Sequence, residues 1–138
     1  MIDLRITLSE NDAKNLQKAG EQAIEAIARV IEAFAIRIDR EIKISIDRGA
    51  KSGRMYGKHQ ASAPGQAPAT DTGGFVKSIS WRSFNRGLSA EVGSHIFYAP
   101  FLEEGTSKMD PRPWLQPAYE KHADDIVDEV TETLKRFL

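Results

Sequence analysis

The feature that most constrains the fold is one long helical repeat of apolar residues. Between residues 10 and 48, apolar side chains recur at steps of three and four, no proline interrupts them, and Gly20 is the only glycine. This spacing predicts a single amphipathic helix that ends before Gly49. An unbroken helix of this length would reach about 58 Å at about 1.5 Å per residue, longer than a domain of this size needs for its own core. We therefore expect part of it to contact another subunit.

Three isoleucines near the end of this stretch indicate where such a contact would form. Ile36, Ile44 and Ile46 lie outside the main apolar stripe, so the second half of the predicted helix is apolar on more than one side. Two interpretations stay open. Either the chain associates with itself through Ile36 and Ile44, or its own domain covers the helix on two sides.

The rest of the chain predicts a small sheet and a second helix within one domain, residues 1–138. Apolar and polar residues alternate from Ile2 to Leu8, as in a strand with one buried face, and Ser9 is placed to cap a helix that begins near Glu10. Residues 80–84 and 88–93 predict a hairpin around Gly87. A C-terminal helix should follow Pro117, with an acidic outer face and with His122 paired to Asp125 at the surface.

A glycine- and proline-rich segment, residues 49–74, separates the two helical regions. Its only large apolar side chains are Met55 and Tyr56, too few to offset about 1–2 kcal/mol of backbone entropy per residue. We therefore expect a mobile loop that becomes ordered on a partner. Two parts of it are candidates for that contact, the cations Arg54 and Lys58 and the extended stretch 61–69 that contains Pro64, Gly65 and Pro68.

The segment from Tyr98 to Ala118 holds four of the six prolines. Pro100 suits the first turn of a short helix, and Gly105 suits the left-handed residue that ends one. Glu103 and Glu104 are neighbours on this turn and diverge by roughly 100°, so they form a poor catalytic pair. Substituting the buried residues of this segment should therefore affect stability.

Two stretches resemble a known family. Tyr98-Ala-x-x-Leu102-Glu103-x-Gly105-Thr106, followed by Arg112-Pro113-Trp114-Leu-x-Pro117-Ala118, is similar to the signature of small minor tail, or tail-completion, proteins of long-tailed bacteriophages. Residues 62–73 are similar to the loop of the same family. Glu104, and Trp114 in place of a more usual phenylalanine, are mild departures from the pattern. Together the two stretches cover about a third of the chain.

The resemblance implies a fold and a function. The fold would be α+β, with long N-terminal and C-terminal helices packed on a small antiparallel sheet. The function would be that of a structural virion protein, present in the host cytoplasm during assembly, which forms a ring at the neck between head and tail or at the tail end. Six copies is one candidate ring number, and the ring would form either alone or only on assembly. Its partners would be head-completion and tail-tube or tail-terminator proteins. The alternative is a non-viral or prophage-derived interaction module of the same fold, without catalysis.

Composition and motif spacing exclude several other classes of function. Nineteen Lys and Arg against twenty Asp and Glu leave a net charge of −1, which argues against direct nucleic-acid binding, and there is no cysteine. The three histidines lack the spacing of a metal site, and the serines lack the context of a nucleophile. No stretch approaches the roughly 20 apolar residues of a membrane span. The sequence therefore predicts no enzyme, no cofactor, no metal and no membrane partner.

Overall fold

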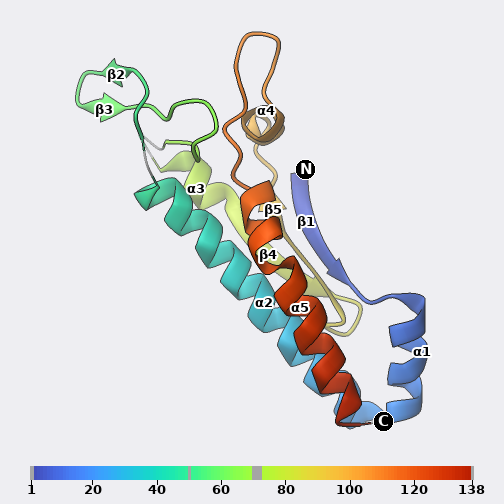
Figure 1. Cartoon of the computed structure of the whole chain (residues 1–138). Coiled ribbons are helices and arrows are strands. Elements are labelled where there is room, and N and C mark those ends of the chain that lie inside the picture. Colours follow the sequence, from blue (N-terminus) through green and yellow to red (C-terminus); the bar gives the residue numbers. More distant parts are fainter. Residues whose placement is uncertain (1, 50, 70–72, 138) are drawn as a thin grey trace.

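The computed structural model describes residues 2–49, 51–69 and 73–137 (Figure 1). The expected α+β class is confirmed, with a small antiparallel sheet and helices at both the N-terminal and C-terminal sides of the sequence. Along the chain the elements are β1 (Ile2–Thr7), α1 (Glu10–Ala19), α2 (Glu21–Arg48), β2 (Met55–Tyr56), β3 (His59–Gln60), α3 (Gly74–Ser78), β4 (Ile79–Phe84), β5 (Ser89–Ser94), α4 (Ala99–Glu104) and α5 (Gln116–Lys135).

The expectation of one unbroken helix from residue 10 to 48 is wrong, because the chain turns at Gly20. Gly20 has φ 91° and ψ −177°, a conformation that is open essentially only to glycine. Its N–H donates to Leu16 O at 3.2 Å to end α1, and its carbonyl accepts from Ile24 N at 3.2 Å to begin α2. The predicted helix start is confirmed, since Ser9 Oγ accepts from Asp12 N at 3.1 Å. The remaining helix, α2, has 28 residues.

The sheet has the strand order β1-β5-β4, and both pairings are antiparallel. The register aligns Leu4, Val92 and Trp81 in one row, so the apolar residues of all three strands share the face that packs on α2. The predicted hairpin is confirmed, with Asn85 and Arg86 at positive φ in the turn. Gly87 lets this turn lie close to α2, because a Cβ there would be only 2.9 Å from the Ala28 Cβ.

The core lies between α2, the sheet and α5. Ile27, Ile31 and Ile42 of α2 are completely buried, and α5 packs along α2 in front of the sheet (Figure 1). Ile46 corrects one expectation, since it is only 1% exposed and belongs to this core. It lies one turn after Ile42, where α3 packs against α2 and covers the end of the apolar stripe. No helix in the described ranges is both long and apolar enough to cross a membrane.

Candidate functional site

The segment from Tyr98 to Ala118 folds into a closed loop that begins with α4. Gly105 ends α4 with φ 78° and ψ 179°, and its N–H donates to Phe101 O at 2.8 Å. A Cβ at Gly105 would lie 2.8 Å from Met109 O, so this position requires glycine for space as well as for conformation. Thr106 and Met109 then form an isolated bridge, and Arg112 N donates to Leu102 O at 2.7 Å. The expected short helix and its glycine end are therefore present.

Glu103 joins this loop to the start of α5. Its carboxylate accepts three backbone N–H groups, from Trp114 at 3.0 Å, Leu115 at 2.6 Å and Gln116 at 3.2 Å. These donors lie just before α5 and at its first residue, where N–H groups have no partner within the helix and where negative charge is favoured. Glu104 is exposed and accepts none of these three N–H groups, in line with the divergence that the helical spacing predicted. Glu103 is thus a helix cap supplied from a distant part of the chain.

Trp114 is the largest side chain that is buried in this segment, with 1% of its surface exposed. Its indole N–H donates to Ala99 O at 3.1 Å, and its ring meets Phe75 edge-on at a centroid distance of 5.3 Å. The Tyr98 ring is tilted by 40° to the Phe75 ring, at a centroid distance of 5.9 Å. Three more motif residues lie at the start of α5. Pro113 is half-buried just before the helix, Pro117 lies in its first turn, and Ala118 is buried. The structure therefore brings the motif residues of this segment into one local unit.

The second half of the loop packs onto this unit, which corrects the expectation that the loop cannot pack on its own chain. Gly65 N donates to Pro111 O at 2.9 Å, and Arg112 Nε donates to Ser62 O at 3.3 Å. Ser62 and Pro68 are buried. Sequence composition missed this because the stabilising partners are backbone groups and Arg112, which lie far along the chain. The family resemblance also implies that Thr72 or Asp71 caps a short helix at residues 75–79, and these two residues lie outside the described ones.

The first half of the loop forms a small hairpin, β2–β3, that projects from the end of α2 (Figure 1). Met55 and Tyr56 are 52% and 59% exposed, and Arg54 and Lys58 are exposed beside them. The Arg54 guanidinium lies 5.4 Å from the centre of the Tyr56 ring. Below the hairpin, Lys51 Nζ donates to Gly49 O at 3.0 Å near the end of α2, and burial lowers the pKa of Lys51. The hairpin therefore presents apolar and cationic side chains together.

The other residues of the loop and of α2 that the sequence singled out lie apart from this hairpin tip. Pro64 and Gly65 are exposed, whereas Pro68 is buried. Ile36 and Ile44 are 37% and 48% exposed and lie two turns apart on the same side of α2. Self-association through these two isoleucines stays a prediction.

A charged cluster between α2 and α5 was not predicted. Glu41 Oε1 accepts from Lys121 Nζ at 2.6 Å, and Glu41 Oε2 lies 3.4 Å from His122 Nε2. The expected surface pair of His122 with Asp125 is wrong, because His122 turns toward α2 and is buried. The hydrogen bond from Lys121 holds the pKa of Glu41 below its usual value, although partial burial acts in the opposite direction. Glu41 and His122 are 81 residues apart, so no local pattern in the sequence predicts this contact.

Glu41→Gln should make the stability of the chain less dependent on acidic pH. The folded pKa of Glu41 lies below the ordinary value of 4.5, so its contribution is fully present above about pH 4.5. That contribution disappears as the pH falls below 4.5 through the folded pKa. Urea unfolding at several pH values should therefore show a shallower loss of unfolding free energy in the variant. Glu132→Gln, at an exposed pair with Lys135, is the control and should keep the parent slope.

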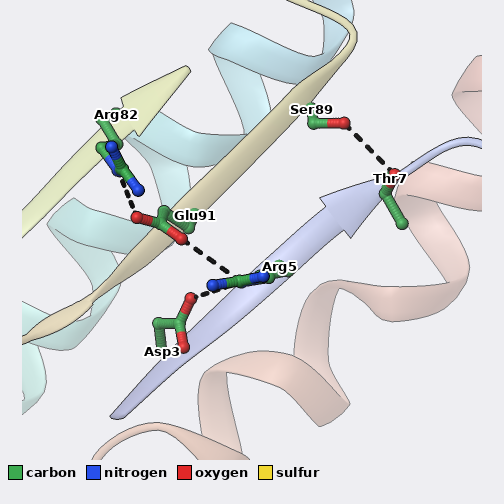
Figure 2. A network of polar contacts seen from close by, with 6 residues as sticks. All are labelled: Asp3, Arg5, Thr7, Arg82, Ser89 and Glu91. Atoms are coloured by element: carbon green, nitrogen blue, oxygen red, sulfur yellow. Dashed lines mark hydrogen bonds and ion pairs between the residues drawn. The ribbon is translucent and has the colours of Figure 1, made fainter. Parts of the chain in front are cut away.

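A second polar network lies on the face of the sheet that is turned away from α2 (Figure 2). Glu91, at the centre of β5, is 1% exposed and forms ion pairs with Arg82 of β4 and Arg5 of β1. Its Oε2 lies 3.3 Å from Arg5 Nε, and Arg5 also donates to Asp3 Oδ2 at 2.9 Å, which raises the pKa of Arg5. The register places the two arginines directly opposite Glu91 in the neighbouring strands. The network ties the three strands together.

The described part of the chain contains no cluster of three or more His, Asp or Glu that could hold a metal ion. The carboxylates that are best positioned, Glu41, Glu91 and Glu103, each bind groups of their own chain. No family model, no curated protein and no solved structure matches the chain. A function has to be argued from the folded segment at Tyr98–Ala118 and from the surfaces that the fold leaves exposed.

Proposed function

We propose that the chain is a structural subunit of a long-tailed bacteriophage, which assembles as a ring that joins the head to the tail or completes the tail. The observation that carries this proposal is the local unit made by the motif residues of Tyr98–Ala118. Its polar groups are used in backbone contacts, as Glu103 and Trp114 illustrate. Residues that resemble a family signature therefore have a structural role, which fits an assembly subunit without catalysis or cofactor.

The exposed apolar side chains support the same proposal. Beside Ile36 and Ile44, large apolar residues are exposed at several places along the chain, namely Met55, Tyr56, Phe97, Phe101 and Val127. Single exposed apolar residues are normal on a protein surface, but clusters of them beside charges mark contacts with other proteins. Head-completion, tail-tube or tail-terminator proteins would be the neighbours of such a ring in the virion.

Deleting the coding sequence from the phage or prophage that carries it tests the proposed function. We expect full heads and separate tails, or tails that are not completed, to accumulate in electron micrographs of lysates. Supplying the intact chain in trans should restore joined particles. Normal infectious particles without the chain would contradict the proposal and favour an interaction module with another role.

Ile44→Asp tests self-association through α2. We expect the variant to weaken assembly at least 10-fold, because a carboxylate would have to be desolvated in the contact. Its monomer should stay folded, since Ile44 is 48% exposed. Gln22→Asp makes the same change of charge at an exposed position on the same helix and should assemble like the parent. Sedimentation velocity measures assembly, and unchanged assembly of Ile44→Asp would exclude this surface.

A further inference from the structure

A continuous apolar groove runs between the free edge of β1 and α5. It consists of two hollows, of about 190 Å³ and about 110 Å³, that share Ile6, Thr7, Ile126 and Val127. One water occupies about 30 Å³ in the liquid, so the larger hollow has room for a side chain. Because β1 is an edge strand that lines both hollows, its outer row of backbone N–H and C=O groups is not paired by β5. The groove is therefore suited to an added strand or hairpin.

The rim and the floor of the groove define what could fill it. Glu120 and Asp124 are exposed residues of α5 that directly follow Tyr119 and Ala123 of the larger hollow, and Asp12 lines the smaller one. The only Lys or Arg that lines either hollow in the described ranges is Arg5, which is already paired with Asp3 and Glu91. The occupant should therefore combine apolar and cationic groups.

His122 adds a polar group to the wall of the larger hollow. It is 6% exposed, and its Nδ1 has no hydrogen-bond partner among the described residues, whereas Nε2 lies 3.4 Å from Glu41. A buried polar atom without a partner is unfavourable. A ligand with an apolar body and a polar end would satisfy it, and a tyrosine side chain has this composition.

The β2–β3 hairpin of the same chain has the complementary chemistry. Tyr56 and Met55 are its exposed apolar side chains, and Arg54 and Lys58 flank them. From residue 48 to 69 the sequence has four Lys or Arg and no Asp or Glu. Within the described residues, Arg54 and Lys58 form no ion pair. The hairpin therefore matches the groove in apolar character, in charge and in its tyrosine hydroxyl.

The hairpin cannot reach the groove of its own subunit in this conformation. Figure 1 shows β2–β3 projecting on one side of the molecule, beyond the end of α2, and β1 on the other side of α5. A contact between these two surfaces must then join different copies. Such a contact uses two different patches, and repeated head-to-tail association of this kind closes into a ring when the rotation between copies allows it.

We infer that the β2–β3 hairpin of one copy docks into the β1–α5 groove of a second copy. Tyr56 enters the larger hollow toward His122 Nδ1, and Arg54 and Lys58 lie against Glu120 and Asp124. This inference rests on the proposed ring, for which it supplies the contact between neighbouring subunits. It also explains why the hairpin carries exposed apolar side chains beside exposed cations.

Cysteine cross-linking tests this contact directly, because the chain has no cysteine of its own. Tyr56→Cys combined with Ala123→Cys should give a ladder of disulfide-linked oligomers on a non-reducing gel after mild oxidation of the purified chain. Tyr56→Cys combined with Ser83→Cys is the matched control, since Ser83 is exposed on β4 and does not line the groove. The control pair should give no ladder above the level of either single variant.

Charge reversal tests the same contact without a covalent bond. R54E/K58E and E120K/D124K should each weaken association at least 10-fold in sedimentation velocity at low salt. The quadruple variant, which reverses both surfaces, should recover association, and so should an equal mixture of the two double variants. Tyr56→Phe should weaken association by about 3- to 10-fold, as expected for the loss of one hydrogen bond.

The outcomes separate this inference from the proposed function. A ladder together with charge rescue supports the contact. The contact is overturned, and the ring proposal stands, in either of two cases. The oligomers form but the Tyr56→Cys and Ala123→Cys pair gives no ladder, or association is unchanged by charge reversal. A chain that is monomeric and gives no ladder at high concentration also overturns the contact. A ladder and rescue in a chain whose deletion leaves normal particles would keep the contact and reject the phage role.

Discussion

Trp114→Ala should lower the free energy of unfolding by about 3–5 kcal/mol, the usual range for removing a large buried aromatic side chain. The ring is 1% exposed and packs edge-on against Phe75, so the variant leaves a cavity that the surrounding backbone can fill only in part. It also removes the hydrogen bond to Ala99 O, whose carbonyl is then left without this donor. Urea unfolding followed by circular dichroism measures the change.

Two further variants separate the contributions to this effect. Trp114→Phe keeps an aromatic ring and removes the indole N–H, so its loss should be smaller, about 1–2 kcal/mol. Phe97→Ala removes an aromatic ring that is 80% exposed and should unfold close to the parent. If Trp114→Ala unfolds like the parent as well, the ring is not held in the core, and the segment Tyr98–Ala118 would serve binding and not stability.

Much of the fold could be predicted from local sequence patterns. The alternation at Ile2–Leu8, the cap at Ser9, the hairpin around Gly87 and the glycine end of α4 each depend on residues close together in the chain. Helix periodicity likewise identified the apolar stripe of α2. These features have short-range causes, so a single sequence contains the signal for them.

The features that could not be predicted depend on contacts between distant segments or on one conformation among several. Gly20 is tolerated within many helices, and only its positive φ shows that the chain turns there. Ile46 is buried near the end of α2, beside which α3 lies, and His122 is buried between α5 and α2, where it meets Glu41. The groove along β1 requires the positions of β1 and α5 together, which no local pattern supplies.

The segment Tyr98–Ala118 contains both features that could be predicted from the sequence and features that could not. Its turn residues Pro100 and Gly105 could be assigned from chain chemistry alone, and the divergence of Glu103 from Glu104 followed from helix geometry. The partners of Glu103 could not be assigned, because the N–H groups that it accepts lie at the start of α5 and just before it, 11–13 residues later. A carboxylate on a short helix has the same local pattern whether it is solvated or caps another helix.

Glu103→Ala should therefore destabilise the chain by about 2–3 kcal/mol, whereas Glu104→Ala should change its stability by less than about 0.5 kcal/mol. The first substitution leaves the N–H groups of Trp114, Leu115 and Gln116 without their acceptor, and Trp114 and Leu115 are buried, so water replaces it poorly. It also removes a negative charge from the start of α5.

The two glutamates make a matched pair, since they are adjacent, belong to the same short helix and carry the same charge. Equilibrium unfolding in urea should show the difference directly, and Glu103→Gln should fall between the parent and Glu103→Ala because it keeps one acceptor oxygen. Equal effects at the two positions would mean that the α5 start is not held by Glu103. The link from α4 to α5 would then depend on Trp114 and on the hydrogen bond from Arg112 N to Leu102 O, and charge at position 103 would be free to serve a partner.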